Sequence, residues 1–437
     1  MVQVGGRDKG RSQRPGPGAF KSISPALRVV VGAGPFVMPP ASATPHTQRL
    51  RIVVLGYIVR GPVGGMAWHH LNYVLGLHQL GHEVLFVEDS DDSAWSCYNP
   101  ATGESGADPG YGVQFAQEAF VRLGLPAAWA YWDQNTARWF GPRAGDADAW
   151  CRSADLLLSV SGINPLRPWT QGVPRRVFID TDPVFTQIRH LTEPGARARA
   201  EAHNLHFTFG ENVGRPGCTM PDDGFAWRPT RQPVALDAWP VVPPPPAADA
   251  AFSTVMLWES YPARDYGGRS YGMKSRSFAD YRDLPRRSPA PLELALGGSG
   301  APRDELRALG WRLADPLAVA RGPWDYQAYL QRSRGEFGVA KHGYASSRCG
   351  WFSERTACYL ASGRPAVVMD TGFRTWLPPG DGLFSFASPD EAVAALEAIV
   401  RAPERHARAA RDVAAACFDA RVVLGRLIDE AMHAPLA

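Results

Sequence analysis

A group of polar residues between positions 341 and 354 is the part of the sequence best suited to chemistry. Lys341, His342 and Arg348 supply positive charge, Ser353 stands where a helix N-cap is expected, and Glu354 follows in the first turn. Free backbone N–H groups at a helix N-terminus, reached by cations, form a site for a phosphate. The segment therefore predicts an anion-binding site, in which Glu354 either accepts hydrogen bonds from ligand hydroxyls or only compensates the helix dipole.

The residues that surround this group are typical of a loop, a helix and a strand in sequence. A short apolar face covers residues 357–361, Gly363 stands at the expected C-cap, and residues 365–369 read PAVVM, a run typical of a buried parallel strand. The segment before Ser353 is rich in glycine and serine and predicts a loop. Lys274, in the loop after an earlier expected strand, offers a second cation, although a solvated loop charge is an equally good interpretation.

A candidate general base follows the first expected strand, residues 51–56 (RIVVLG). The next loop contains Gly64 and Gly65 and leads into a helix expected over 67–80, but its glycines do not match the dinucleotide-binding fingerprint. A histidine at such a helix start is suited to proton transfer. We expect His69 to face a ligand, whereas His70 and His78 share apolar helix stripes and are expected in the core.

Composition excludes several classes of protein. The 437 residues carry a net charge of +3 and no basic domain, so nucleic acid binding is not expected, and no apolar run is long enough to cross a membrane. The six cysteines form no CxxC pair, which argues against a zinc or thioredoxin-type site and is typical of reduced thiols in a cytoplasmic protein. We expect a cytoplasmic protein that uses neither a bound metal nor a cofactor.

Strands alternate with helices along two stretches that a proline-rich segment separates, which predicts an α/β protein with two parallel sheets. Ligands in such sheets collect beyond the carboxyl ends of the strands, here residues 56–65, 88–92, 161–164 and 180–182 in the first stretch. The expected segments are a disordered tail (1–48), an N-terminal Rossmann-like domain (49–239), a linker (240–251), a C-terminal Rossmann-like domain (252–420) and a C-terminal helix (421–437).

This layout, with SERTACYLASGRPAVVMDTGF at residues 353–373, resembles the bacterial glycosyltransferases of the GT-B fold, of the kind found in families 1 and 4. In those enzymes a helix that ends in small-Gly-x-Pro leads into a strand of the nucleotide-sugar site. The resemblance implies two Rossmann-like domains facing across a cleft, with the donor on the second and the acceptor on the first. It assigns Lys274, Lys341, His342, Arg348 and Ser353 to the donor diphosphate and Glu354 to the donor ribose. Cys358 stands where the commonest retaining branch has its ribose-binding glutamate, so the stereochemical outcome stays open.

Asp180 and Asp182, at the end of another expected strand, match the metal-binding DxD of the other glycosyltransferase fold. The proline-rich linker and the second α/β series argue against that fold. The two acids are instead expected beside the cleft, as an alternative base or as acceptor-orienting groups, with loop capping an equally good interpretation.

The sequence thus predicts a hexosyltransferase-class enzyme that moves a sugar from a nucleotide-diphosphate donor to a hydroxyl of a small molecule, a glycan or a lipid-linked acceptor, without a metal. Its expected catalytic residues are His69, Asp180 and Asp182, with Gly64 and Gly65 in an acceptor-side loop. Two alternatives stay open: a nucleotide-sugar epimerase of the same layout, which would need no acceptor, and a non-catalytic two-lobed binding protein.

Overall fold

The computed structural model describes residues 48–245 and 250–435. The expected tail at 1–48 lies almost wholly outside the described residues, as do residues 246–249 of the expected linker and the last two residues of the chain. Within the described ranges no helix is long and apolar enough to cross a membrane. The domain boundaries given above stay predictions.

The first sheet has eight strands, all parallel except the last pair, in which β6 runs antiparallel to β5. Its central strands are apolar on both faces, as a parallel sheet covered by helices requires, and every residue of β7 is buried. The order across the sheet is β10 (Trp227–Pro229), β9 (Leu205–Thr208), β8 (Arg175–Asp180), β7 (Leu156–Val160), β1 (Arg51–Leu55), β2 (Glu83–Asp89), β5 (Trp129–Asp133) and β6 (Arg138–Phe140).

The second sheet has six strands, all parallel. Leu292, Leu294 and Leu296 of one strand are at most 1% exposed and belong to its apolar core. The order is β15 (Arg312–Ala314), β14 (Leu292–Gly297), β11 (Phe252–Leu257), β16 (Gly335–Gly338), β17 (Ala366–Met369) and β18 (Leu383–Phe386). Two hairpins stand outside the sheets, β3 (Cys97–Asn99) with β4 (Glu104–Gly106) and β12 (Arg264–Tyr266) with β13 (Arg269–Tyr271).

Each sheet reverses its strand order at one place. In the first sheet the chain goes from β1 to β2 on one side and later resumes with β7 on the other side of β1. In the second sheet β14 and β16 flank β11 in the same way. Crossover connections leave in opposite directions at such a switch point, which opens a crevice beyond the carboxyl ends of the two strands. The fold therefore provides two crevices, one beyond β1 and β7 and one beyond β11 and β16.

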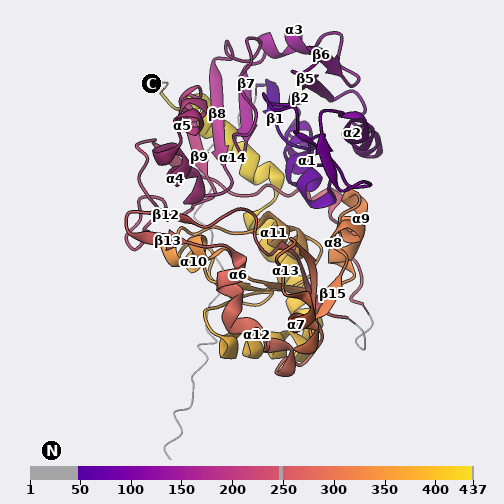
Figure 1. The fold of residues 1–437 in the computed structure, drawn as a ribbon, viewed down its shortest axis with the longest axis vertical. Coiled ribbons are helices and arrows are strands. Elements are labelled where there is room, and N and C mark those ends of the chain that lie inside the picture. Colours follow the sequence, from indigo (N-terminus) through magenta and orange to yellow (C-terminus); the bar gives the residue numbers. More distant parts are fainter. Residues whose placement is uncertain (1–47, 246–249, 436–437) are drawn as a thin grey trace, which may run out of the picture. The chain divides into compact units, whose positions relative to one another are not determined.

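Helices cover the sheets, as the ribbon in Figure 1 shows. They are α1 (Gly64–Gln79), α2 (Gly110–Arg122), α3 (Ala147–Arg152), α4 (Phe185–Thr192), α5 (Pro194–Glu201), α6 (Lys274–Phe278), α7 (Arg303–Ala308), α8 (Pro316–Val319), α9 (Pro323–Gln331), α10 (His342–Ser347), α11 (Glu354–Ala361), α12 (Pro389–Arg401), α13 (Pro403–Cys417) and α14 (Ala420–His433).

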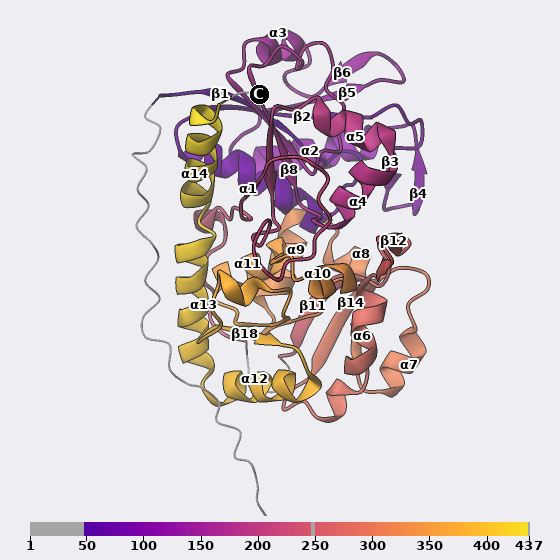
Figure 2. The same ribbon diagram turned by 90° about the vertical axis from the view of Figure 1, so that its left-hand side faces the viewer.

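The last two helices are successive but serve different sheets (Figure 2). α13 packs against α11 beside the second sheet, whereas α14 returns to α1 beside the first. At that contact a Cβ added to Gly76 would lie 2.5 Å from the Cβ of Ala420, so the glycine permits the close approach. α14 begins as a separate helix because the Asp419 side chain accepts a hydrogen bond from the Arg421 amide.

One sequence expectation needs correction: in the segment before Ser353, residues 342–347 form the short helix α10 rather than a loop. It ends at Arg348, which adopts a left-handed φ of 53°. Gly343 lies inside it because a Cβ there would be 2.5 Å from the Phe185 ring. The glycine therefore serves packing between α10 and α4.

Candidate functional site

A cleft of about 720 Å³ opens beyond β11 and β16, between elements of the two sheets. The first half contributes the start of α1 and the ends of β7 and β8, and the second half contributes β11, α6, α9 and the start of α11. The cleft brings together seven of the residues singled out from the sequence: Gly65, His69, Asp182, Lys274, Lys341, Ser353 and Glu354.

The N-terminus of α11 forms one wall of this cleft. Ser353 caps the helix, with its Oγ accepting a hydrogen bond of 3.2 Å from the Arg355 amide, as the sequence predicts. Ser353, Glu354 and Arg355 all line the cleft, so the helix start faces it. A cation such as Arg355 in a first turn opposes the helix dipole. Its side chain is held by the fully buried Glu336, whose Oε1 accepts from Arg355 Nε at 2.7 Å, and by the Val255 carbonyl.

Three further cations, Lys274, Lys341 and Arg303, line the same cleft. Burial and the neighbouring charges of Arg355 and Lys341 lower the pKa of Lys274 to about 7. Within the described part of the chain Lys274 makes no ion pair and no side-chain hydrogen bond, so its ammonium remains available to a ligand. An arrangement of this kind binds an anion, because a negative ligand relieves the repulsion between the cations.

Lys341 is held differently, in a polar cluster that joins the two halves. Its Nζ lies 2.8 Å from Asp182 Oδ1 and 2.8 Å from the Tyr261 hydroxyl. Tyr261 also donates to Asp182 Oδ2 at 2.5 Å, and Tyr344 donates to Asp182 Oδ1. Burial raises the pKa of Asp182, but the Lys341 ammonium and these hydrogen bonds outweigh it, so the pKa lies below its usual range. Asp182 is therefore a weak base while Lys341 is paired with it.

His69 and Glu354 both line the cleft and interact electrostatically. Burial lowers the pKa of His69, and the negative charge of Glu354 opposes that shift only partly. The imidazole is thus neutral near pH 7 and able to accept a proton. Glu354 is only partly exposed, and no residue within 48–245 or 250–435 hydrogen-bonds or ion-pairs with its carboxylate. Both groups remain available to a ligand.

Four predicted site residues do not line the cleft. Asp180 is 1% exposed and accepts hydrogen bonds from Gln187 (3.0 Å), Thr208 (2.8 Å) and the Asp182 amide (2.9 Å). The His342 ring takes a hydrogen bond from the Gly272 amide, and Arg348 is exposed at the end of α10. A Cβ on Gly64 would lie 2.1 Å from the Gly322 carbonyl oxygen, so this glycine packs the start of α1 against α9.

The other two histidines of α1 differ in burial. His70 is fully buried, with Nδ1 3.0 Å from the Met66 carbonyl oxygen, which agrees with its expected place in the core. His78 is exposed, so its expected place in the core is wrong. The buried stretch of α1 ends at Leu77, so the helical stripe that suggested a core position stops before His78.

The aspartates of the DxD pattern point to different partners, Asp180 to side chains of the first sheet and Asp182 to Lys341 of the second half. Across the residues that the structure describes, no three His, Cys, Asp or Glu side chains converge as metal ligands would. Arg355, Arg303 and Tyr344 are cleft residues that sequence reasoning missed. Arg355 had a readable signal, since a cation in a helix first turn runs against the dipole preference.

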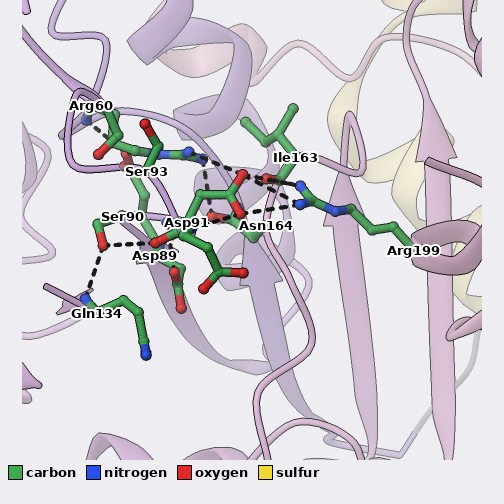
Figure 3. A network of polar contacts seen from close by, with 12 residues as sticks. Arg60, Asp89, Ser90, Asp91, Ser93, Gln134, Ile163, Asn164 and Arg199 are labelled. Carbon is green, nitrogen blue, oxygen red and sulfur yellow. Dashed lines mark hydrogen bonds and ion pairs between the residues drawn. The ribbon is translucent and has the colours of Figure 1, made fainter. Parts of the chain in front are cut away.

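A second cavity, of about 530 Å³, lies beyond β1 and β7 at the switch point of the first sheet. It shares Met66 and Ser161 with the cleft. Figure 3 shows the polar network at its wall, where the Arg199 guanidinium contacts the Asp91 carboxylate at 3.1 Å and the Ile163 carbonyl oxygen at 2.7 Å. Two residues here adopt left-handed φ angles without being glycine, Asp91 (60°) and Ser161 (65°). Such conformations cluster at ligand sites.

No protein-family model and no curated protein matches the sequence. Solved structures match the fold. An α-glucosyltransferase in complex with UDP and a 13-mer DNA aligns with a TM-score of 0.52 and 10% identity, over 88% of this chain and 99% of that one. Sucrose-phosphate synthase from Thermosynechococcus elongatus has a TM-score of 0.46 and 12% identity, over 88% of this chain and 100% of that one. The lipopolysaccharide outer core galactosyltransferase WaaB has 0.46 and 15%, over 87% and 98%.

At these sequence identities the matches are evidence for the fold alone. The α-glucosyltransferase match, with a TM-score of 0.52, is the one that supports it. The predicted fold class is confirmed, because two parallel sheets face a common cleft and the match spans nearly the whole of both chains. This chain has the GT-B glycosyltransferase fold, with two Rossmann-like domains that face each other across a cleft.

Proposed function

We propose that this protein is a glycosyltransferase that transfers a sugar from a nucleotide-diphosphate donor to an acceptor hydroxyl. The observation that carries the proposal is the cationic helix start, in which Lys274, Arg355 and the α11 N-terminus line one cleft at a switch point. The leaving group of such a reaction is a diphosphate that gains negative charge as the sugar bond breaks. Cations and oriented amides that await this charge stabilise the transition state. We propose that Lys274, Arg355 and the α11 amides stabilise the leaving diphosphate without a metal ion.

The chemistry assigned to the cleft is a displacement at the anomeric carbon. The acceptor oxygen forms a bond to that carbon, the bond from carbon to the diphosphate oxygen breaks, and the acceptor proton passes to the neutral imidazole of His69. Glu354 lies close enough for its charge to favour the imidazolium that results. A base opposite the leaving group fits an inverting reaction.

Glu354 has a second proposed role, to accept hydrogen bonds from the donor ribose. Its unpaired carboxylate at the cleft wall is compatible with both roles. Asp182 is proposed only as a reserve base or an acceptor-orienting group, because Lys341 neutralises it. Asp180 is assigned to stabilising the end of β8.

The α-glucosyltransferase with the same fold was solved with UDP and DNA. This observation supports a uridine nucleotide as the first donor to test. We retain a small molecule, a glycan or a lipid-linked molecule as the acceptor class, with nucleic acid outside it, and place the enzyme in the cytoplasm.

The test begins with a thermal-shift and calorimetric screen of UDP, TDP, GDP and ADP against the purified chain. We expect at least one to bind, and Lys274→Met to weaken it about tenfold or more, since a charge-assisted hydrogen bond is worth about 1.5–3 kcal/mol. Arg401→Met, which removes an exposed charge from α12, is the matched control. Binding of no diphosphate, or equal affinity in the Lys274 variant, would contradict the proposal.

The matching nucleotide sugar, labelled in the sugar, then separates the alternatives. A glycosyltransferase moves the label to an acceptor or slowly to water. An epimerase interconverts the sugar with no acceptor present, and a binding protein returns the donor unchanged.

A further inference from the structure

The cavity beyond β1 and β7 contains an arginine whose hydrogen bonds are largely unmade. Arg60 is only 5% exposed and lines this cavity. Its apparent partner, Glu88, is occupied by the backbone amides of residues 58, 59 and 60, at 2.5, 2.6 and 2.7 Å. The guanidinium therefore stays 3.5 Å from Glu88 and 4.0 Å from Asp91. Its one side-chain hydrogen bond within the described residues is to Asn164, at 3.3 Å, and its buried Nε has no partner there.

A guanidinium carries five N–H donors, and a buried donor left unpaired costs free energy. The Arg60 guanidinium cannot move closer to Glu88 to make these hydrogen bonds, because three backbone amides, including that of Arg60, hold the Glu88 carboxylate in place. Such a group is stabilised when a ligand supplies an acceptor. A carboxylate or a phosphate matches the planar fork best.

A second arginine lines the same cavity without an ion pair. The Arg189 guanidinium donates to Thr186 Oγ1 at 3.2 Å and forms no salt bridge within residues 48–245 and 250–435. The acids of the cavity wall are already neutralised, since Asp91 pairs with Arg199 and Glu193 pairs with Arg264 at 2.6 Å. The cavity thus has an uncompensated positive charge.

We propose that this cavity binds the acceptor of the proposed reaction and selects an acceptor that carries an anionic group, a carboxylate or a phosphate, between Arg60 and Arg189. That the bound molecule is an acceptor rests on the proposed function; that the cavity binds an anion does not. The shared residues Met66 and Ser161 place the cavity next to the cleft, so an acceptor anchored by its anion can extend a hydroxyl toward His69.

The test uses three probes with a similar ring and different charge: glucose, glucuronic acid and glucose 6-phosphate. Their binding to the full chain is measured by saturation-transfer NMR and calorimetry, with and without saturating UDP. We expect one or both charged sugars to bind at least about tenfold more tightly than glucose, with UDP present. Tighter binding of glucuronic acid would indicate a carboxylate as the preferred group, and tighter binding of glucose 6-phosphate would indicate a phosphate.

Two variants locate the binding. Arg189→Met removes the unpaired charge, and Gly195→Glu adds a carboxylate at the cavity wall. A Cβ on Gly195 meets nothing within 4 Å, and a glutamate in the first turn of α5 suits the helix dipole, so this variant keeps its fold. Each is expected to weaken the charged sugar about tenfold or more, whereas Arg138→Met, on the same sheet but outside the cavity, leaves its affinity unchanged.

Three outcomes would overturn the inference: equal affinity for glucose, unchanged affinity in both Arg189→Met and Gly195→Glu, or loss of the charged sugar in Lys274→Met alone, which would place it in the cleft. If UDP does not bind at all but the charged sugars bind in an Arg189-dependent manner, the proposed function fails and the anion site stands.

Discussion

Lys274 connects the charge of the cleft to pH. In the empty cleft its pKa is about 7, because burial and two nearby cations disfavour the ammonium. A bound diphosphate reverses that balance and stabilises the protonated form. Binding is therefore coupled to proton uptake between about pH 7 and the higher pKa that Lys274 has beside the bound diphosphate.

The affinity for UDP should consequently fall as pH rises. We expect about a tenfold loss between pH 7.5 and pH 9, where the UDP phosphates are already fully ionised, measured by calorimetry. Lys274→Arg is the control, since an arginine stays charged throughout this range and should bind UDP with little pH dependence. A parent protein with the same affinity at both pH values would show that Lys274 does not contact the phosphates.

The two roles of Glu354 separate through the ligand chosen. If its carboxylate accepts hydrogen bonds from the ribose, Glu354→Gln should weaken UDP by about tenfold and leave inorganic pyrophosphate, which has no ribose, unaffected. An unchanged UDP affinity with a lower kcat would mean that Glu354 acts by stabilising the His69 imidazolium and not by binding the ribose.

His69→Asn tests the base. General base catalysis contributes about a hundredfold or more, so kcat should fall by that factor while the dissociation constant of UDP stays the same. Wild-type turnover in this variant would remove His69 from the mechanism and return attention to Asp182.

Single residues were only partly readable in the sequence. The spacing from Lys341 to Glu354 located the cleft, because a cap and its neighbours are local features. The pairing of Lys341 with Asp182 was not readable, since the two residues come from different halves and meet only in the folded chain. His78 was misplaced because the buried stretch of α1 ends at Leu77, and apolar spacing alone does not show where burial stops.

At the scale of elements, α11 combines a structural cap with a binding role, and the chain offers a matched comparison. Ser353 caps α11 and Ser388 caps α12, each through a side-chain oxygen that accepts from a first-turn amide. Ser353→Ala and Ser388→Ala should each lower the free energy of unfolding by about 1 kcal/mol in urea titrations. Only Ser353→Ala should also weaken UDP, because only α11 faces the cleft. Equal effects on UDP would mean that the cap acts through stability alone.

The apolar strands β1 and β17 were predicted within one residue at each end, as 51–56 and 365–369. Their signal is strong because a parallel strand buried on both faces needs a continuous apolar run. The short edge strands β15 and β18 and the helix α10 carried no such run, and their pairing depends on neighbours distant in sequence.

At the scale of the whole molecule, Asn212 joins the two halves. It is 4% exposed, and its Nδ2 donates to the carbonyls of Arg348 and Gly372 at 3.0 Å each while its Oδ1 accepts from Thr375. Asn212→Ala leaves these groups unpaired and should lower the free energy of unfolding by about 2–4 kcal/mol.

Asn204→Ala is the matched control for that variant. It removes two side-chain hydrogen bonds, to Arg176 and Pro174, which lie within the first half and at a partly exposed position. We expect a loss below about 1 kcal/mol there, since water replaces the lost partners. Equal losses in the two variants would show that Asn212 does not hold the halves together.

The two sheets were predictable from the sequence, because runs of apolar residues are a local feature. The contacts across the cleft were not, since they join loops whose conformation has no periodic signal. The expected acceptor-side loop illustrates this, as Gly64 proved to pack against α9 of the second half.

The return of α14 to α1 means that the chain passes between the halves twice, once after Trp239 and once between Cys417 and Ala420. A single proteolytic nick in the proline-rich passage would leave both pieces attached, and trimming the last helix would remove the packing of α14 on α1 and β8. With two tethers in place, we expect any relative motion of the halves to be a rotation about the line that joins the two passages.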